Sequence, residues 1–276
     1  MPELPEVEVI RRGLFPHAVG RQVVGIRSSG KTLRRPVPMD ILEQRLLGSI
    51  FTDISRRAKY LLFSNSHNDL LIIHLGMTGK LGIFPEGSPT ATHDHLIFRL
   101  DNSTELRFND IRRFGMVHYI VQHDRNREEQ HFFRTSGPEP FSDKITPAYL
   151  HNRAKGNSQA VKTFIMNGRI IAGIGNIYAN ESLFSAGIHP QRPAGTLSRP
   201  KWRRLIETIQ TTLHHAIACG GSTISDYVNA SGRSGYFQVN FRVYGRQGEA
   251  CRNCEAVIQK KVINGRASYF CSRCQK

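Results

Sequence analysis

The first residues of the chain combine a nucleophile with neighbouring acids. Pro2 follows Met1, and a small second residue normally allows removal of the initiator methionine, which would leave Pro2 with a free secondary amine. Such an amine has a pKa near ~8, so part of it is unprotonated at neutral pH. Glu3 lies beside it, and Glu6 lies one helical turn further on. Amines form Schiff bases with carbonyl-type carbons while carboxyl groups move protons, so this segment could perform covalent catalysis.

Four cysteines near the C-terminus have zinc-ribbon spacing. Cys251 and Cys254 form one CxxC pair, and Cys271 and Cys274 form another after sixteen intervening residues. Two such pairs complete a tetrahedron around one Zn²⁺. Four thiolates leave no open position, so we expect a structural ion that stabilises the ribbon. Cys219 is left over and is expected to be a buried, inert thiol.

The charge balance indicates a polyanionic partner. The chain has 38 Lys and Arg against 22 Asp and Glu, a formal net charge of +16. This excess favours nucleic acid over a generally basic soluble protein. No segment reads as a secretory signal or a membrane span, and no stretch pairs a basic face with a bulky apolar one. A disulfide framework and a membrane-bound protein are therefore disfavoured.

The first half of the chain has the pattern of a leading helix followed by short strands. Apolar residues on one face predict a helix over residues 5–17, with Pro5 in its first turn. Strands are expected over residues 22–27, 60–63, 70–75, 95–100, 105–108 and 116–121. This spacing suggests a β-sandwich or barrel-like domain. A polar, proline-rich stretch at residues 135–144 predicts a linker.

Helices are expected from about residue 146 to residue 230. The clearest covers residues 198–219, where an apolar stripe ends at Gly220 and Gly221. Shorter helices are predicted over residues 158–166 and 177–186. Asn176 precedes the second of these after a glycine-rich turn, where backbone N–H groups suit a phosphate. A plain N-cap explains Asn176 equally well.

Together these motifs resemble the bacterial formamidopyrimidine-DNA glycosylases, base-excision repair enzymes for oxidised purines. The resemblance runs end to end and rests on PELPEVE (2–8), RRAKYLL (56–62), HLGMTG (74–79), RRFG (112–115), GIGNIYANESLF (173–184), GGSTISDYV (220–228), GYFQ (235–238) and the four-cysteine ribbon. Several motifs in one order are far more specific than any one of them.

The resemblance implies an α+β fold. Its expected parts are an N-terminal helix plus antiparallel β-sandwich (1–135), a linker (136–146), a helix–two-turn–helix domain with a lesion-capping loop (147–240) and a C-terminal four-cysteine zinc β-ribbon (241–276). It also implies a cytoplasmic, nucleoid-associated monomer without a redox cofactor. Double-stranded DNA with oxidised bases or abasic sites would bind in a cleft between the two halves.

The resemblance further implies a glycosylase that is also an abasic-site lyase. Pro2 would attack C1′ of the damaged nucleotide, and Glu3 would protonate the sugar-ring oxygen before β- and δ-elimination. Glu6 matches a supporting carboxylate, although a helix dipole also favours a charge there. Lys59 matches a lysine that contacts the DNA backbone and assists elimination, whereas a charged run is otherwise usually a solvated face. Arg266 matches a ribbon arginine that grips phosphates beside the lesion.

Other positions match DNA contacts in the family. His74, His93 and Asn176 match phosphate contacts. Asn157 stands where some relatives carry a lysine near the backbone, a departure for which Arg153, Lys155 or Lys162 could substitute.

Three residues match those that fill the gap left by an extruded nucleotide. They are Met77, Arg112 and Phe114, which combine an apolar wedge, a hydrogen-bonding cation and a stacking ring. Without the resemblance, the methionine and the phenylalanine would be assigned to the core. The Gly- and Ser-rich residues 221–237 match a loop that closes over the everted base.

Two alternatives remain open. An endonuclease VIII-type glycosylase for oxidised pyrimidines shares the Pro2 and Glu3 chemistry, but PELPE and the pair Arg112 and Phe114 favour the purine enzyme. A non-enzymatic zinc-ribbon DNA-binding protein would leave the N-terminal pair without a purpose.

Overall fold

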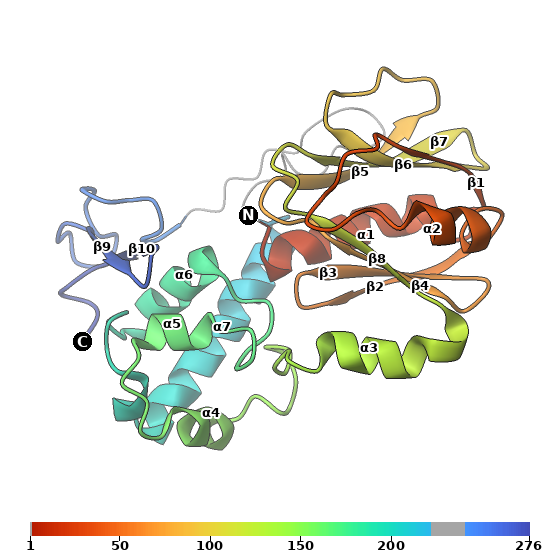
Figure 1. The fold of residues 1–276 in the computed structure, drawn as a ribbon. Helices are drawn as coiled ribbons and strands as arrows, with labels where there is room; N and C mark the ends of the chain where they lie inside the picture. The colour runs from red at the N-terminus through yellow and green to blue at the C-terminus, as the bar shows by residue number, and fades with distance from the viewer. Residues whose placement is uncertain (1, 222–240) are drawn as a thin grey trace. The chain divides into compact units, whose positions relative to one another are not determined.

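The computed structural model describes residues 2–221 and 241–276 of the chain. These residues form two compact units, drawn as ribbons in Figure 1. The first runs from the N-terminus to Arg134 and takes in the described residues from Cys219 to Gly221. The second runs from Thr135 to Ala218 and takes in the described C-terminal residues from Phe241. Each unit has its own apolar core.

The described part of the first unit is a sandwich of two four-stranded antiparallel sheets with helix α1 (Leu4–Ala18) against it. The strand orders are β1-β6-β7-β5 and β2-β3-β4-β8. The strands are β1 (Val23–Ser28), β2 (Phe51–Arg57), β3 (Tyr60–Asn65), β4 (Leu70–His74), β5 (Gly79–Pro85), β6 (Asp94–Leu100), β7 (Thr104–Asp110) and β8 (Met116–Ile120). Helices α2 (Met39–Arg45), η1 (Gln122–Asp124) and α3 (Arg125–Phe133) flank them. The predicted β-sandwich with a leading helix is confirmed.

Helix α1 holds the N-terminus of the protein against this sandwich. Pro5 lies in its first turn, where a missing N–H costs no hydrogen bond. Val7, Ile10 and Leu14 share its apolar face and are at most 2% exposed. The helix contacts β2 and β3 of one sheet and β5 of the other, so it is fixed by both.

Strands β2 and β5 and helices α2 and α3 are absent from the sequence-based prediction. In β2 only Phe51 and Ile54 are buried, and β5 contains Gly79 and Gly82. Neither strand alternates cleanly, because its burial depends on partners far along the chain. All residues of α3 are described, and none of them is buried. The sequence therefore has no apolar stripe that would predict this helix.

The second unit is built on a helical core. Its helices are α4 (Pro147–Ala154), α5 (Val161–Ile165), α6 (Asn176–Ala186), η2 (Ala194–Thr196) and α7 (Arg199–Ala218). The predicted stripe of α7 is confirmed, since Trp202, Leu205 and Leu213 are fully buried. The helix expected over residues 158–166 is shorter than predicted. The expected linker has neither helix nor strand between α3 and α4.

The C-terminal residues form a ribbon that rests on α6. Strands β9 (Gln259–Ile263) and β10 (Arg266–Phe270) pair in an antiparallel hairpin. Asn264 and Gly265 join them with φ values of +47° and +70°, the signature of a tight Asn-Gly turn. The small apolar cluster of the ribbon includes Phe184 of α6. The ribbon therefore completes its core with a side chain of the helical domain.

The backbone of Lys276 is tied to the turn after α6. Its N–H donates to Gly187 O at 3.1 Å, and its carbonyl accepts from the N–H of His189 at 3.1 Å.

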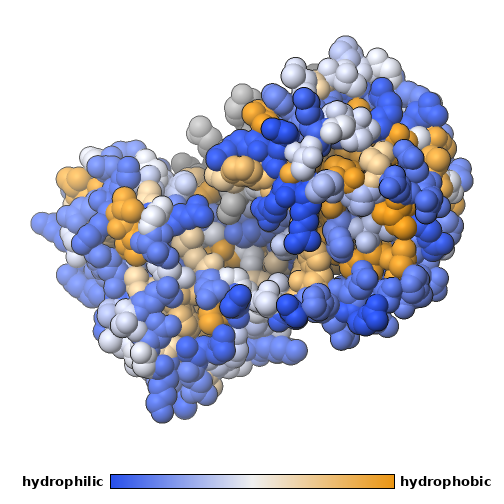
Figure 2. All heavy atoms as spheres, viewed as in Figure 1, coloured by the Kyte–Doolittle hydropathy of each residue, from blue (hydrophilic) through white to orange (hydrophobic). Residues whose placement is uncertain are grey.

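Across the described residues, no helix is long and apolar enough to span a bilayer. Figure 2 shows hydrophilic side chains over much of the face in view, with apolar residues in scattered patches.

Candidate active site and nucleic-acid interface

The amino end of α1 brings Pro2, Glu3 and Glu6 together in a buried place. Pro2 is buried, and Glu3 and Glu6 are 2% and 4% exposed. The backbone N–H of Glu3 donates to Glu6 Oε2 at 2.8 Å, within a reciprocal capping box. In this box the side chain of Glu3, the residue after Pro2, accepts from the backbone N–H of Glu6. The box also gives Glu6 a structural reason to be present, as the helix-dipole explanation anticipated.

Gly221 lies against this group. Its φ is +84°, and a Cβ added there would lie 3.4 Å from Glu6 Oε1. The remainder of the predicted capping loop, residues 222–237, lies outside the described residues.

Lys59 lies in the two-residue turn between β2 and β3. Ala58 takes a φ of +54° there, an uncommon conformation for a residue with a Cβ. Arg56 supports the turn, because its Nη1 donates to Ala58 O at 2.9 Å and its Nε donates to Glu8 Oε2 at 3.3 Å. The turn that carries Lys59 is thereby fixed to α1.

Glu8 is the acceptor that this connection needs. Arg11 Nη2 and Arg12 Nε also donate to its Oε1, at 2.9 Å and 2.8 Å. Burial alone would raise the pKa of the Glu8 carboxyl, but the hydrogen bonds from Arg11 and Arg12 outweigh it and lower the pKa. Glu8 is therefore an ionised anchor at neutral pH.

The loops after β4 and after β7 pack backbone against backbone. Gly76 has a φ of +66°, and a Cβ there would lie 2.4 Å from the carbonyl carbon of Phe114. A Cβ on Gly79 would lie 2.1 Å from Leu75 O. Gly76 is thus required by the close approach of the two loops, and Gly79 by the tight turn of its own loop.

Asp110, which is fully buried, ties these loops together. Its Oδ1 accepts from Thr78 Oγ1 at 2.6 Å and its Oδ2 accepts from the N–H of Gly115 at 2.7 Å. The N–H of Arg112 donates to Thr78 Oγ1 at 3.0 Å, and the N–H of Asp110 donates to the carbonyl of His93 at 3.0 Å. Sequence reasoning missed Asp110 and Thr78, because their partners lie far along the chain.

The predicted insertion residues lie on these two loops. Phe114 is 44% exposed and its neighbour Ile111 is 57% exposed, which excludes a core role for Phe114. The guanidinium of Arg112 lies 4.7 Å from the centroid of the Phe114 ring. Met77 is half-buried on the other loop.

His74 is a neutral hydrogen-bonding group. Burial, reinforced by the charges of Arg34 and Lys59, lowers its pKa to about 4. Its Nδ1 lies 3.0 Å from the N–H of Gly76 and accepts that proton. The ring proton of neutral His74 is therefore on Nε2, where it can serve a ligand as a donor. His93 is half-buried.

Asn176 is not the N-cap that the sequence allowed. Gly175 is the N-cap of α6, Asn176 is the first helical residue, and its side chain makes no cap hydrogen bond. Its Oδ1 is buried without a hydrogen-bond partner among the described residues. Asn157 precedes α5, is half-buried, and accepts from the N–H of Gln159 at 2.8 Å.

Lys162 has surroundings that do not fit the expected DNA contact. Its side chain belongs to α5 and is 1% exposed. Its Nζ donates to Ala267 O at 2.8 Å and to Ser268 Oγ at 2.6 Å, both on β10. Arg153 and Lys155 are exposed, so they remain available to a partner.

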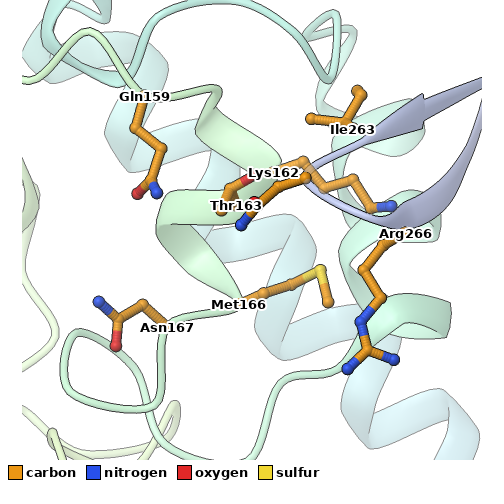
Figure 3. A pocket seen from close by; sticks show the side chains of 8 residues that line it. Gln159, Lys162, Thr163, Met166, Asn167, Ile263 and Arg266 are labelled. Carbon is orange, nitrogen blue, oxygen red and sulfur yellow. The ribbon is translucent and has the colours of Figure 1, made fainter.

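Arg266 begins β10 directly after the Asn-Gly turn and is exposed. It lies at the rim of a cavity of about 330 Å³ between α5 and the hairpin, shown in Figure 3. Residues of both elements line this cavity, namely Gln159, Lys162, Thr163, Met166, Asn167, Ile263, Asn264 and Arg266.

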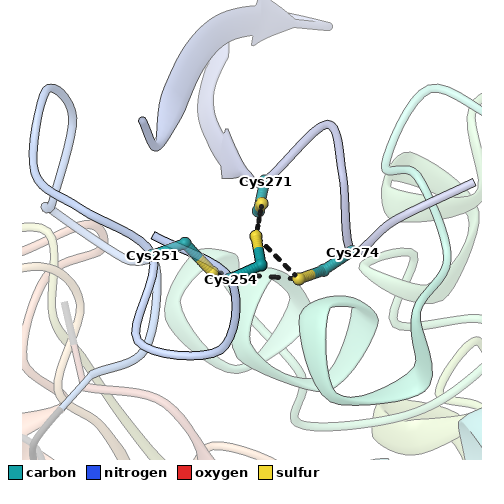
Figure 4. Close-up of side chains that lie close together, drawn as sticks. All are labelled: Cys251, Cys254, Cys271 and Cys274. Carbon is teal, nitrogen blue, oxygen red and sulfur yellow. Dashed lines mark hydrogen bonds between the residues drawn. The ribbon is translucent and has the colours of Figure 1, made fainter. Parts of the chain in front are cut away.

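The four cysteines form a closed tetrahedral site, shown in Figure 4. The Sγ of Cys254 lies 3.4 Å from the Sγ of Cys271 and 3.4 Å from the Sγ of Cys274. The Sγ atoms of Cys251 and Cys274 are 3.8 Å apart. Zn–S bonds of about 2.3 Å require sulfur separations of about 3.8 Å, so the cluster fits one Zn²⁺. Burial and the neighbouring thiols raise the pKa of the Cys274 thiol, so four thiolates require the cation. Cys219 is half-buried rather than buried as expected.

Two polar side chains of α6 hold the ribbon in place. The Glu181 carboxylate accepts the consecutive N–H groups of Arg242, Val243 and Tyr244 at 2.8–3.0 Å. Asn180 Oδ1 accepts the N–H of Tyr269 at 2.8 Å. Both residues lie within the GIGNIYANESLF motif, but their partners are 61 to 89 residues further along the chain, so the motif alone did not show this role.

A β-sandwich with a leading helix, a helix–two-turn–helix domain and a four-cysteine ribbon together define a class of DNA glycosylases. The models of the formamidopyrimidine-DNA glycosylase N-terminal domain, its H2TH domain and the zinc finger found in FPG and IleRS match residues 1–117, 136–228 and 248–276. The chain belongs to the formamidopyrimidine-DNA glycosylase family.

Its relatives match over their full length. The formamidopyrimidine-DNA glycosylases of Syntrophotalea carbinolica and Xanthomonas campestris are 47% and 44% identical, and each comparison covers 100% of both chains. A Lactococcus lactis Fpg mutant in complex with Fapy-dG DNA and the Lactococcus lactis Fpg with abasic-site DNA are 33% and 32% identical, each with a TM-score of 0.90 and complete coverage of both chains.

We expect Gly76→Ala to destabilise the protein by about 3 kcal/mol, because its Cβ would strike backbone that cannot move aside. Gly87→Ala is the matched control. Gly87 also has a positive φ of +79°, but a Cβ there meets nothing within 4 Å. Urea denaturation measures both, and equal losses would show that the two loops are not closely packed.

His74 should contribute to the acid sensitivity of the fold. Its folded pKa lies below its ordinary value of 6.5, so its stabilisation is complete above pH 6.5 and is lost as the pH falls towards about 4. The full shift corresponds to about 3 kcal/mol. His74→Asn keeps an acceptor for Gly76 and cannot titrate, so its stability should fall less between pH 6.5 and 4.5. The exposed His67→Asn is the control and should leave the wild-type slope unchanged.

Loss of one zinc ligand should unfold the ribbon, because metal binding supplies on the order of 10 kcal/mol to such small modules. Cys254→Ser is expected to lose zinc and to become sensitive to protease within residues 241–276. Cys219→Ser should keep one zinc per chain. Metal analysis and limited proteolysis measure both, and a protected, zinc-free Cys254→Ser ribbon would contradict the metal's role.

Proposed function

We propose that the protein is a bifunctional DNA glycosylase and abasic-site lyase of base excision repair that removes oxidised purines from duplex DNA. The observation that carries this is the burial of Pro2, Glu3 and Glu6 together at the start of α1, in a chain that matches its family from end to end. It would act as a monomer on the DNA of the bacterial nucleoid.

The chemistry begins at the Pro2 amine after removal of Met1. The amine attacks C1′, a bond from nitrogen to C1′ forms, and the bond from C1′ to the damaged base breaks. Glu3 protonates the sugar-ring oxygen, so the ring opens and an iminium links Pro2 to the sugar. Loss of a C2′ proton then expels the 3′ phosphate, and δ-elimination expels the 5′ phosphate. Lys59 would contact the DNA backbone and assist these eliminations.

The remaining residues hold the DNA. His74 would donate Nε2–H to a phosphate as a neutral group, and Arg266 would offer its fork of donors. His93, Asn157 and Asn176 are further candidates for backbone contacts.

Met77, Arg112 and Phe114 would fill the gap in the duplex once the damaged nucleotide is extruded. The exposure of Phe114 and the stacking of Arg112 on it support this role.

The substrate class follows the relatives. Solved complexes of the Lactococcus lactis Fpg contain Fapy-dG DNA, abasic-site DNA and DNA with an oxidised pyrimidine. Oxidised purines and abasic sites are therefore proposed as substrates. The complex with an oxidised pyrimidine favours including such a base as the second candidate.

Pro2→Gly should slow base release and strand cleavage by about 100-fold or more, because the secondary amine is the nucleophile. Affinity for a duplex with a tetrahydrofuran abasic analogue should remain close to that of the wild type, since Pro2 supplies chemistry and not binding. Single-turnover assays on 8-oxoguanine opposite cytosine measure the rates.

Borohydride trapping on the same duplex provides the decisive result. A cross-linked peptide that begins at Pro2 supports the mechanism. An adduct only on a thymine-glycol duplex would favour the pyrimidine enzyme, and no adduct on either would favour a non-enzymatic DNA-binding protein.

A further inference from the structure

We propose that Lys162 is a positioning residue that fixes the hairpin tip bearing Arg266, and that it does not itself contact DNA. This inference rests on the proposed role of Arg266 as a phosphate contact. Its basis is the place of the ammonium inside the second unit, between α5 and β10.

A buried ammonium is costly unless it is well hydrogen-bonded. Lys162 is 1% exposed, and its Nζ has two short contacts to β10. An apolar side chain of similar length would fill the same space without that cost. The ammonium therefore has a role beyond packing, and its hydrogen-bond acceptors on β10 indicate that role.

Those atoms flank the backbone of Arg266. Nζ donates directly to the carbonyl of Ala267 and to Ser268 Oγ, and Ser268 Oγ donates to the carbonyl of Arg266 at 3.2 Å. Ser268 is fully buried. A hydrogen-bonded path thus leads from α5 to the backbone of Arg266.

The tip needs such a support. An isolated two-stranded hairpin is marginally stable in water, and β9 and β10 pair only with each other among the described strands. The cysteines flank the open end of the hairpin, and Asn180 holds it at Tyr269 near that end. Lys162 is the anchor nearer the turn.

The neighbouring cavity gives the tip room to move. Figure 3 shows the side chains of Lys162 on α5 and Arg266 on the hairpin among those that line this space of about 330 Å³. Without the ammonium, the tip can shift into the cavity and move its guanidinium away from a bound phosphate.

A double-mutant cycle with full-length protein tests the inference. The variants are Lys162→Met, Arg266→Gln and the double variant, and the probe is a duplex with a tetrahydrofuran abasic analogue, titrated by fluorescence anisotropy. Lys162→Met should weaken binding about tenfold when Arg266 is present and less than about twofold in Arg266→Gln, because its effect passes through that side chain. Zinc content and melting temperature verify that each variant is folded.

Two further variants sharpen the result. Ser268→Ala removes one of the two acceptors for Lys162 Nζ and keeps the carbonyl of Ala267. Its loss of DNA affinity should therefore be smaller but should depend on Arg266 in the same way. This variant tests the inference even if Lys162→Met folds poorly. The variant Lys155→Met, at an exposed lysine, is the control for a direct charge contact with DNA. Its loss of affinity should be the same with Arg266 and with Arg266→Gln. It should also lower the slope of log affinity against log salt by about 0.9. Lys162→Met in Arg266→Gln should leave that slope unchanged.

The outcomes separate this inference from the proposed function. Equal losses from Lys162→Met in both backgrounds, or no loss in either, would overturn the positioning role while leaving Arg266 as a phosphate contact. Unchanged affinity in Arg266→Gln would instead remove the proposed role of Arg266, and the inference would fall with it.

Discussion

The ionised carboxylate of Glu8 is the interaction on which the N-terminal site depends. It accepts hydrogen bonds from Arg11 and Arg12 of its own helix and from Arg56 at the end of β2. The start of α1 and the turn with Lys59 are thereby joined through one acceptor. Chain termini usually fray. Here the capping box and the Glu8 cluster hold the start of α1, so that Pro2 and Glu3 are buried, as the proposed role of Pro2 as a nucleophile requires.

The same principle applies at the loops and in the ribbon. The Asp110 carboxylate joins two loops by hydrogen bonds, and its backbone N–H donates to the carbonyl of His93. The Glu181 carboxylate accepts three backbone N–H groups. In each case a buried carboxylate organises segments that have little regular structure. The exposed Arg112 is placed through the hydrogen bonds of Asp110 and Thr78 rather than by a helix or strand alone.

Local signals in the sequence predict part of this arrangement. The periodicity of α1 and α7, the CxxC spacing and the motifs of the family are all short-range patterns. Strands β2 and β5 escape prediction because their burial comes from distant partners, and Asp110 and Glu181 escape for the same reason. Lys162 is instructive, since a lysine in a basic chain suggests DNA while the fold encloses its ammonium. Residue type indicated the chemistry, but only the fold showed which lysines can reach a ligand.

Both ends of the described chain are built into the fold, which matters for labelling the protein. A tag placed before Pro2 would keep its nitrogen in an amide, so the amine proposed as the nucleophile would not form, and the tag would extend from a buried residue. An extension after Lys276 would start from backbone that is hydrogen-bonded to Gly187 and His189. Gly87, on the exposed connection between β5 and β6, has open space around it. We therefore expect a dye or a short peptide insertion beside Gly87 to disturb neither the start of α1 nor the ribbon.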